Sequence, residues 1–292
     1  MILHLLNVIT PVLIVIALGW GWVRSGRPYD TNLVTGLVMT IGAPCLVFST
    51  LSTLHISPQL LVKMGGAALG VMGLSAVIGA VILRFAGLSL QDFLPPLIFA
   101  NIGNMGLPLC LFAFGKPGLA LAIVVFTVFC IGHFTVGVWL YSGSASLLSL
   151  LKIPVIYAVG LAIVVLLTRA TLPEWIVKTT ELLGSFTIPL MLLTLGVSLG
   201  RLQVMNIRRA MAISLLRLGM GFGLGILAAT LFNFTGTARG VIILQSSMPV
   251  AVFNYLLAQQ YQRNANETAG LVVISTLCSL ATLPLVLVFI GA

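Results

Sequence analysis

The stretch "ANIGNMGLPLCLFAFG", residues 100–115, interrupts a segment that is otherwise apolar enough to span a membrane. Two asparagines, two glycines and a proline are crowded into residues 101–108. Glycine weakens a helix, and proline cannot donate the backbone hydrogen bond to the preceding turn. The stretch therefore predicts a helix that is broken near its middle.

Composition shows that this helix belongs in a lipid bilayer. The chain has 292 residues, of which 60% are hydrophobic and 7% charged, whereas soluble domains carry roughly 25% charged residues. A spanning helix needs about 20 mostly apolar residues, because its backbone must satisfy its own hydrogen bonds in hydrocarbon. The sequence therefore predicts an all-α integral membrane protein.

Polar residues divide the chain into ten apolar segments, each of a length suited to one crossing. The expected segments are 3–23, 32–54, 60–84, 93–115, 118–141, 150–168, 174–199, 207–232, 238–260 and 267–290. Only short loops remain between them, so we expect the function to lie within the bilayer. The first segment has neither a basic region before it nor a small-residue cleavage site after it, and we expect it to be a retained helix.

Basic residues predict the orientation, because loops rich in Lys and Arg stay in the cytoplasm. With ten spans, one side would carry Arg24, Arg27, Arg84, Lys152, Arg201, Arg208, Arg209 and Arg263, and the other Lys63, Lys116, Arg169, Lys178 and Arg239. Both termini of this multi-pass protein are therefore expected outside the cell (inner) membrane. The same bias accounts for the net charge of +9, so no nucleic-acid partner is expected.

Prolines indicate an internal repeat, since three pairs recur at offsets of 141 to 145 residues. The pairs are Pro11 with Pro154, Pro44 with Pro189, and Pro108 with Pro249. We therefore interpret residues 1–292 as a single transporter unit with repeats at 1–141 and 150–292. Five spans per repeat would insert the second copy upside down, giving the inverted repeats typical of transporters.

The ninth segment repeats the break of the fourth. Its stretch "LQSSMPVAVFNY", residues 244–255, places serines before Pro249, and a serine followed by a proline is a helix start. We expect Pro108 and Pro249 each to open a half-helix near the membrane midplane. Two positive half-helix ends that meet there would attract an anion.

These breaks and their neighbours define the expected binding site. The substrate-binding candidates are Asn101, Gly103, Asn104, Pro108, Ser246, Ser247, Pro249 and Asn254, with Phe48 and Met191 as an apolar wall. Three further residues are candidates for coupling or for the vestibule: Gln245, His133 and Arg217. Arg217 either extends its charge toward Arg208 and Arg209 or draws an anion inward. His133 is either a proton carrier or a structural histidine.

Three stretches resemble the auxin efflux carrier family, which includes plant auxin exporters and bacterial organic-anion carriers. They are "NIGNMGLPL" (101–109), "MPVAVFNYLLAQQY" (248–261) and "LVVISTLCSLATLPLVLV" (271–288). The resemblance implies ten helices with the fourth and ninth broken and crossed. It also implies a scaffold of helices 1, 2, 6 and 7, a mobile transport domain of helices 3–5 and 8–10, elevator motion and a homodimer. Asn101 falls on the family's substrate-contacting asparagine.

The family's plant members carry a long central hydrophilic loop, and residues 142–149 are too few to form one. Control by loop phosphorylation is therefore not carried over, nor is auxin as the substrate. Four of the five carboxylates are expected at or near helix ends, and Glu181 about two turns into the seventh segment, which disfavours a paired-carboxylate antiporter. The G-x-S-x-G match at 196–200 ends a membrane helix and predicts helix packing rather than an enzyme's nucleophile.

The sequence thus predicts a secondary carrier of a small organic anion, such as a mono- or dicarboxylate. No cofactor, metal or ATP site is expected, since the sequence has no Walker A motif. One alternative is a sodium-coupled symporter like the bile-acid carriers, with Gln245 and freed carbonyls binding sodium. The other is a membrane sensor that uses the same pocket, although it would need an output domain.

Overall fold

The structure is a computed structural model that describes residues 2–53, 57–143, 151, 153–168 and 170–291. The first half of the chain contains α1 (Ile2–Arg24), α2 (Thr31–Leu37), the π-helix η1 (Val38–Gly42), α3 (Ala43–Thr53), α4 (Pro58–Phe85), α5 (Leu90–Ile98), the π-helix η2 (Ile102–Gly106), α6 (Leu107–Gly132), the π-helix η3 (His133–Gly137) and α7 (Val138–Ser142). The second half contains α8 (Pro154–Thr168), α9 (Glu174–Ser185), α10 (Thr187–Arg201), α11 (Ile207–Leu231), α12 (Gly236–Ser246), α13 (Val252–Gln260) and α14 (Ala265–Ile290).

The prediction of an all-α membrane fold is confirmed. Seven helical stretches among the described residues are long and apolar enough to cross a membrane. They are Leu6–Arg24, Thr31–Thr53, Pro58–Phe85, Ile102–Ser142, Glu174–Arg201, Ile207–Leu231 and Ala265–Ile290.

The number of candidate spans differs from the ten expected, because the structure joins some of the expected segments into one helical stretch and divides others into shorter helices. Ile102–Ser142 is 41 residues long, about twice what one crossing needs. Gly115 interrupts it with φ of +66°, a conformation that favours glycine. Conversely, α12 and α13 are each too short to cross alone. The ten-span arrangement and the inverted repeat remain predictions.

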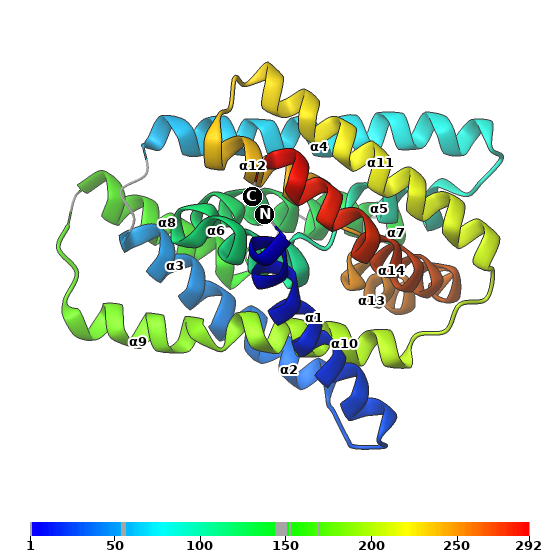
Figure 1. The fold of residues 1–292 in the computed structure, drawn as a ribbon, viewed down its shortest axis with the longest axis horizontal. Helices are drawn as coiled ribbons and strands as arrows, with labels where there is room; N and C mark the ends of the chain where they lie inside the picture. The colour runs from blue at the N-terminus through cyan, green and yellow to red at the C-terminus, as the bar shows by residue number, and fades with distance from the viewer. Residues whose placement is uncertain (1, 54–56, 144–150, 152, 169, 292) are drawn as a thin grey trace.

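Helix starts are set by side chains that accept hydrogen bonds from the first backbone N–H groups. Such N-caps are Asp30 for α2, Ser57 for α4, Ser89 for α5, Asn206 for α11 and Asn264 for α14. The connections α4–α5, α10–α11 and α13–α14 gather at one end of the molecule, at the right of Figure 1. The α8–α9 connection lies at the opposite end.

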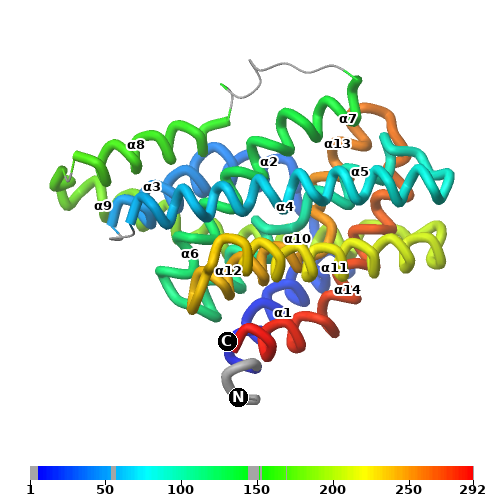
Figure 2. The backbone as a smooth tube through the Cα atoms, turned by 90° about the horizontal axis from the view of Figure 1, so that it is seen from above, coloured from blue at the N-terminus to red at the C-terminus, as the bar shows by residue number. Residues whose placement is uncertain are grey.

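The helices pack as two groups. In one, α1 packs along α10, and α3 packs between α8 and α9. In the other, α11 packs against α4, α12 and α14, and α6 packs against α4 and α12. Figure 2 shows α3, α8 and α9 together on one side, apart from α11, α12 and α14. The two broken segments belong to the second group.

Glycines let α1 and α10 touch backbone to backbone. A Cβ atom on Gly19 would collide with the carbonyl of Leu193, and one on Gly196 would collide with the carbonyl of Ile16. Small residues allow this approach between membrane helices, where van der Waals packing drives association. The prediction that the glycines of residues 196–200 serve helix packing is confirmed.

Gly196→Leu is expected to force α1 away from α10 and lower the melting temperature by several degrees, since overpacking typically costs about 1–3 kcal/mol. Gly219→Leu is the matched control, because a Cβ atom there meets no other atom. Thermal unfolding of both purified variants checks this, and equal melting temperatures would contradict the close contact.

Candidate functional site

The chain breaks its helices at two places that lie against each other. After α5 ends at Ile98, Phe99 is extended and Asn101 precedes the next helical turn. After α12 ends at Ser246, the chain stays non-helical until Val252. Ala100 and Val250 form an antiparallel bridge between the two breaks. Asn101 N donates to Pro249 O at 2.7 Å, and Ala251 N donates to Phe99 O at 3.2 Å.

The breaks are real, but the prolines do not open the half-helices. Helical geometry resumes at Ile102, well before Pro108, and again at Val252, three residues after Pro249. The π-helix η2 accommodates Pro108, because a widened turn leaves room where a proline donates no hydrogen bond. The π-helix η1 does the same ahead of Pro44.

Asn254 fastens the two breaks together. It lies in α13, is fully buried, and its Nδ2 donates to Phe99 O at 2.9 Å and Ala251 O at 3.2 Å. Ser275 of α14 adds a support, because its Oγ accepts from Val250 N at 3.0 Å. Side chains thus complete the hydrogen bonding of backbone that helices cannot satisfy here.

A cavity of about 90 Å³ opens beside the first break. Its walls come from α2 and η1, the first break, α6 and η3, α10, and the start of α13. The lining residues are Thr31, Thr35, Val38, Met39, Phe99, Ala100, Asn101, Ile102, Gly103, Asn104, Phe126, Phe129, Cys130, His133, Phe134, Met191, Thr194, Ala251, Val252, Phe253 and Leu256. The cavity therefore lies between the two packing groups.

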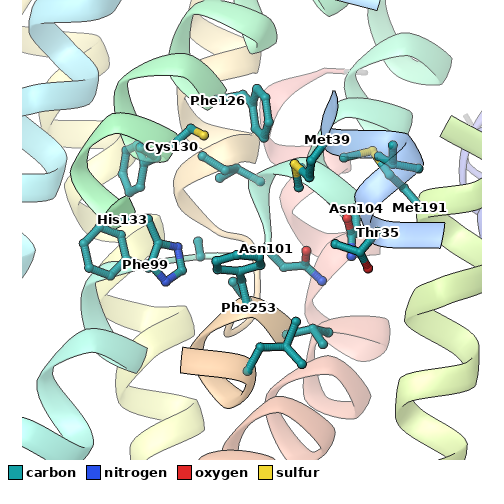
Figure 3. Close-up of a pocket in the computed structure, with 18 of the residues that line it drawn as sticks. Thr35, Met39, Phe99, Asn101, Asn104, Phe126, Cys130, His133, Met191 and Phe253 are labelled. Carbon is teal, nitrogen blue, oxygen red and sulfur yellow. The ribbon is translucent and has the colours of Figure 1, made fainter. Parts of the chain in front are cut away.

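The cavity has a polar side and an aromatic side. The amide of Asn101 points toward Asn104 and Thr35 in Figure 3, and its Nδ2 has no hydrogen-bond partner among the described residues. The other side is formed by phenylalanines and by His133, whose ring stacks on Phe99 at 4.3 Å between centroids. No Lys, Arg, Asp or Glu is among the described lining residues.

The structure brings five of the expected site residues to this cavity: Asn101, Gly103, Asn104, Met191 and His133. The remaining candidates lie elsewhere. Ser246 and Ser247 are buried at the end of α12, and the Ser247 hydroxyl donates to Ile243 O at 2.7 Å. The other five do not line it either: Pro108, Pro249, Asn254, Phe48 and Gln245. Pro249 and Asn254 instead hydrogen-bond to residues of the first break, which borders the cavity.

Neither sequence interpretation of Arg217 fits the structure. The side chain is only 1% exposed, so it does not extend to the surface near Arg208 and Arg209. It does not line the described cavity either; its Nη2 donates to Ser246 O at 3.1 Å. The small Gly221, one turn further along α11, leaves the guanidinium room to fold against α12.

Sequence reasoning missed the polar residues on α2 and α10. Thr31 and Thr35 lie four residues apart, on one face of α2, and Thr194 lies on α10. The spacing of Thr31 and Thr35 was the available signal, but an isolated pair of threonines is common in membrane helices. These threonines line the cavity only because the fold brings α2 and α10 next to the first break.

At the C-terminal end of α10, Arg201 supports this polar side. Its Nη2 donates to Tyr29 O at 2.7 Å and its Nη1 to Thr31 Oγ1 at 2.9 Å. The hydroxyls of Tyr29 and Thr194 are 2.7 Å apart, and burial raises the pKa of the Tyr29 phenol. A second hollow beside α13 shares Thr35, Phe253 and Leu256 with the cavity; its other lining residues are Asn32, Gln259 and Gln260.

Comparison with known proteins identifies the class of protein to which this architecture belongs. Residues 140–287, just over half of the chain, match the family model described as "Membrane transport protein". The chain therefore belongs to this auxin efflux carrier-like family of membrane transport proteins. It is also 26% identical to an uncharacterized transporter of Methanocaldococcus jannaschii, over 96% of this chain and 97% of the relative. Both findings indicate a transporter rather than an enzyme.

Asn254→Leu should loosen the paired breaks, because Phe99 O and Ala251 O lose their shared donor. Each carbonyl keeps one backbone donor, so the variant loses the two side-chain hydrogen bonds, each typically worth about 0.5–1.5 kcal/mol. The melting temperature is expected to fall by several degrees, with Asn7→Leu, at an exposed position of α1, as the control. If the two variants unfold at the same temperature, the Asn254 side chain does not stabilise the paired breaks.

Proposed function

We propose that this protein is a secondary carrier that binds a small organic monocarboxylate in the cavity beside the paired breaks. The observation that supports this most is the unpartnered amide of Asn101, which lies at the start of a helical run and borders a cavity with no charged lining. Such an arrangement can bind an anion through backbone and amide N–H groups.

The electrostatics favour a carboxylate without a direct ion pair. The first N–H groups of a helix have no partner within the helix, and the N-terminus carries about half a positive charge. Helical runs start at Ile102 and Val252, and both residues line the cavity. Asn101 Nδ2 would donate a further hydrogen bond to the same anion. A negative group is therefore favoured at the polar side.

The aromatic side restricts what else the ligand can carry. Phe126, Phe134 and Phe253 add further aromatic rings to the lining of the cavity. A second carboxylate would be desolvated against these rings with no cation to compensate it. Of the two anion classes expected from the sequence, the cavity therefore favours a monocarboxylate with an apolar body over a dicarboxylate.

Movement between the two packing groups would complete a transport cycle. We propose that α1–α3 and α8–α10 form the scaffold, and that the helices carrying the breaks form the moving domain of an elevator. The cavity at their boundary supports this, since sliding would carry the ligand with the breaks. The inverted repeat, the homodimer through the scaffold, and termini outside the cell (inner) membrane are part of the same proposal and rest on the family resemblance and the charge bias.

Asn101→Ala should weaken carboxylate binding while the protein still folds. A hydrogen bond to a charged group contributes about 1.5–3 kcal/mol, or roughly ten- to a hundredfold in affinity. Isothermal titration of phenylacetate into the purified variant measures the loss, with Asn7→Ala as the control at an exposed site. Unchanged affinity in Asn101→Ala would remove this residue from the site.

Transport itself is tested in proteoliposomes loaded with unlabelled phenylacetate. Wild-type protein is expected to exchange external radiolabelled phenylacetate for the internal pool, and succinate should compete weakly. Binding without any exchange would contradict the carrier and favour a sensor. Strong competition by succinate would overturn the preference for monocarboxylates.

A further inference from the structure

A buried arginine contacts the end of the helix that precedes the second break. Arg217 of α11 is buried to 1% exposure, and its Nη2 donates to the carbonyl oxygen of Ser246, the last residue of α12. The last carbonyls of a helix have no partner within the helix and carry its negative dipole end. The guanidinium therefore caps a helix C-terminus that ends inside the membrane-spanning region.

No carboxylate in the described structure balances this charge. The five acids of the chain have other partners: Asp30 caps α2, Asp92 accepts from Asn264 N, and Glu174, Glu181 and Glu267 pair with Lys178, Lys116 and Arg209. Arg217 Nε and Nη1 have no hydrogen-bond partner among the described residues. The carbonyl end of α12 is thus the negative partner that the structure gives Arg217.

The position of this contact matters for the site. Ser246 is followed directly by the extended residues that pair with the first break, where Pro249 O accepts from Asn101 N. Fixing the end of α12 fixes the point from which the second break departs. Arg217 is therefore joined, through one short segment of backbone, to the residue that borders the cavity.

We propose that Arg217 is a built-in cation that stabilises the freed carbonyl end of α12, so that ligand binding requires no sodium ion. The inference rests on the proposed carrier function, and it favours a carrier that works without sodium over a sodium-coupled symporter. A sodium-coupled carrier would use a metal ion at freed carbonyls of a broken helix. Here a guanidinium already lies against such a carbonyl, and it moves with the helices that hold the site.

Gln245 is the residue expected to bind sodium in the alternative, and its Oε1 and Nε2 have no hydrogen-bond partner among the described residues. Its side chain is fully buried, and its amide packs so closely against Gly106 that an added Cβ atom there would collide with Oε1. The amide thus occupies the space between α12 and η2. It does not line the described cavity.

The test compares Arg217→Lys, which keeps a positive charge, with Arg217→Met, which keeps an apolar stem without charge. Melting temperatures are measured without ligand, and phenylacetate affinity by isothermal titration, each in sodium chloride and in N-methylglucamine chloride at equal ionic strength. Arg208→Met is the control, since Arg208 is exposed at the start of the same helix.

Wild type is expected to give the same melting temperature and affinity in both salts. Arg217→Met should melt several degrees lower and bind phenylacetate at least tenfold more weakly, and Arg217→Lys should recover most of both losses. A sodium requirement in the wild type would overturn the proposal, and so would equal damage by Lys and Met, which would assign the role to shape rather than charge.

The melting temperatures keep the two proposals separable. If phenylacetate fails to bind wild-type protein, the proposed carrier function loses its support, while the order of stability among the variants still tests the capping role. If Arg217→Met does not fold at all, wild-type binding in the two salts still tests whether sodium is dispensable.

Discussion

Backbone hydrogen bonding in hydrocarbon is the constraint on which the rest of this structure depends. A broken helix leaves N–H and C=O groups that water cannot reach, and each unsatisfied group is costly. The two breaks solve this together: Asn101 and Ala251 donate to carbonyls across the bridge, and Asn254 holds Phe99 O and Ala251 O. Ser275 and Arg217 satisfy one further group each. Each break thus satisfies part of the other's backbone.

This mutual dependence links fold to function. Because the breaks must meet, two helical runs begin at the same place and both border the cavity. Their N-termini supply positive potential without a lysine or arginine in the wall, so no basic side chain has to be moved or neutralised during a transport cycle. The charge of Arg217 lies elsewhere, against the carbonyl oxygen of Ser246 at the C-terminal end of α12. In the proposed carrier, recognition and structural support thus use separate charges.

The sequence predicted the breaks and five of the residues that line the cavity, for identifiable reasons. Glycine, proline and asparagine within an apolar segment indicate an interruption wherever it occurs, so the stretches around Asn101 and Pro249 were recognisable. The exact start of each half-helix was wrong. A π-helix lets the chain pass Pro108 without breaking, and α13 begins only at Val252, three residues after Pro249. Thr35 and Thr194 were missed because the four-residue spacing of Thr31 and Thr35 is a weak signal and nothing local marks Thr194. Only the packing of α2 and α10 against the first break makes them part of the cavity.

The central claim is that backbone dipoles and amide donors, without a direct basic side chain, select an anion. It is tested most directly by titrating phenylacetate and its neutral amide, phenylacetamide, into the wild-type protein at neutral pH. Each helix end contributes about 0.3–1 kcal/mol when exposed and up to about 2 kcal/mol when partly buried, so two ends predict a preference for the acid on the order of a hundredfold. Equal affinities for the acid and the amide would contradict the account.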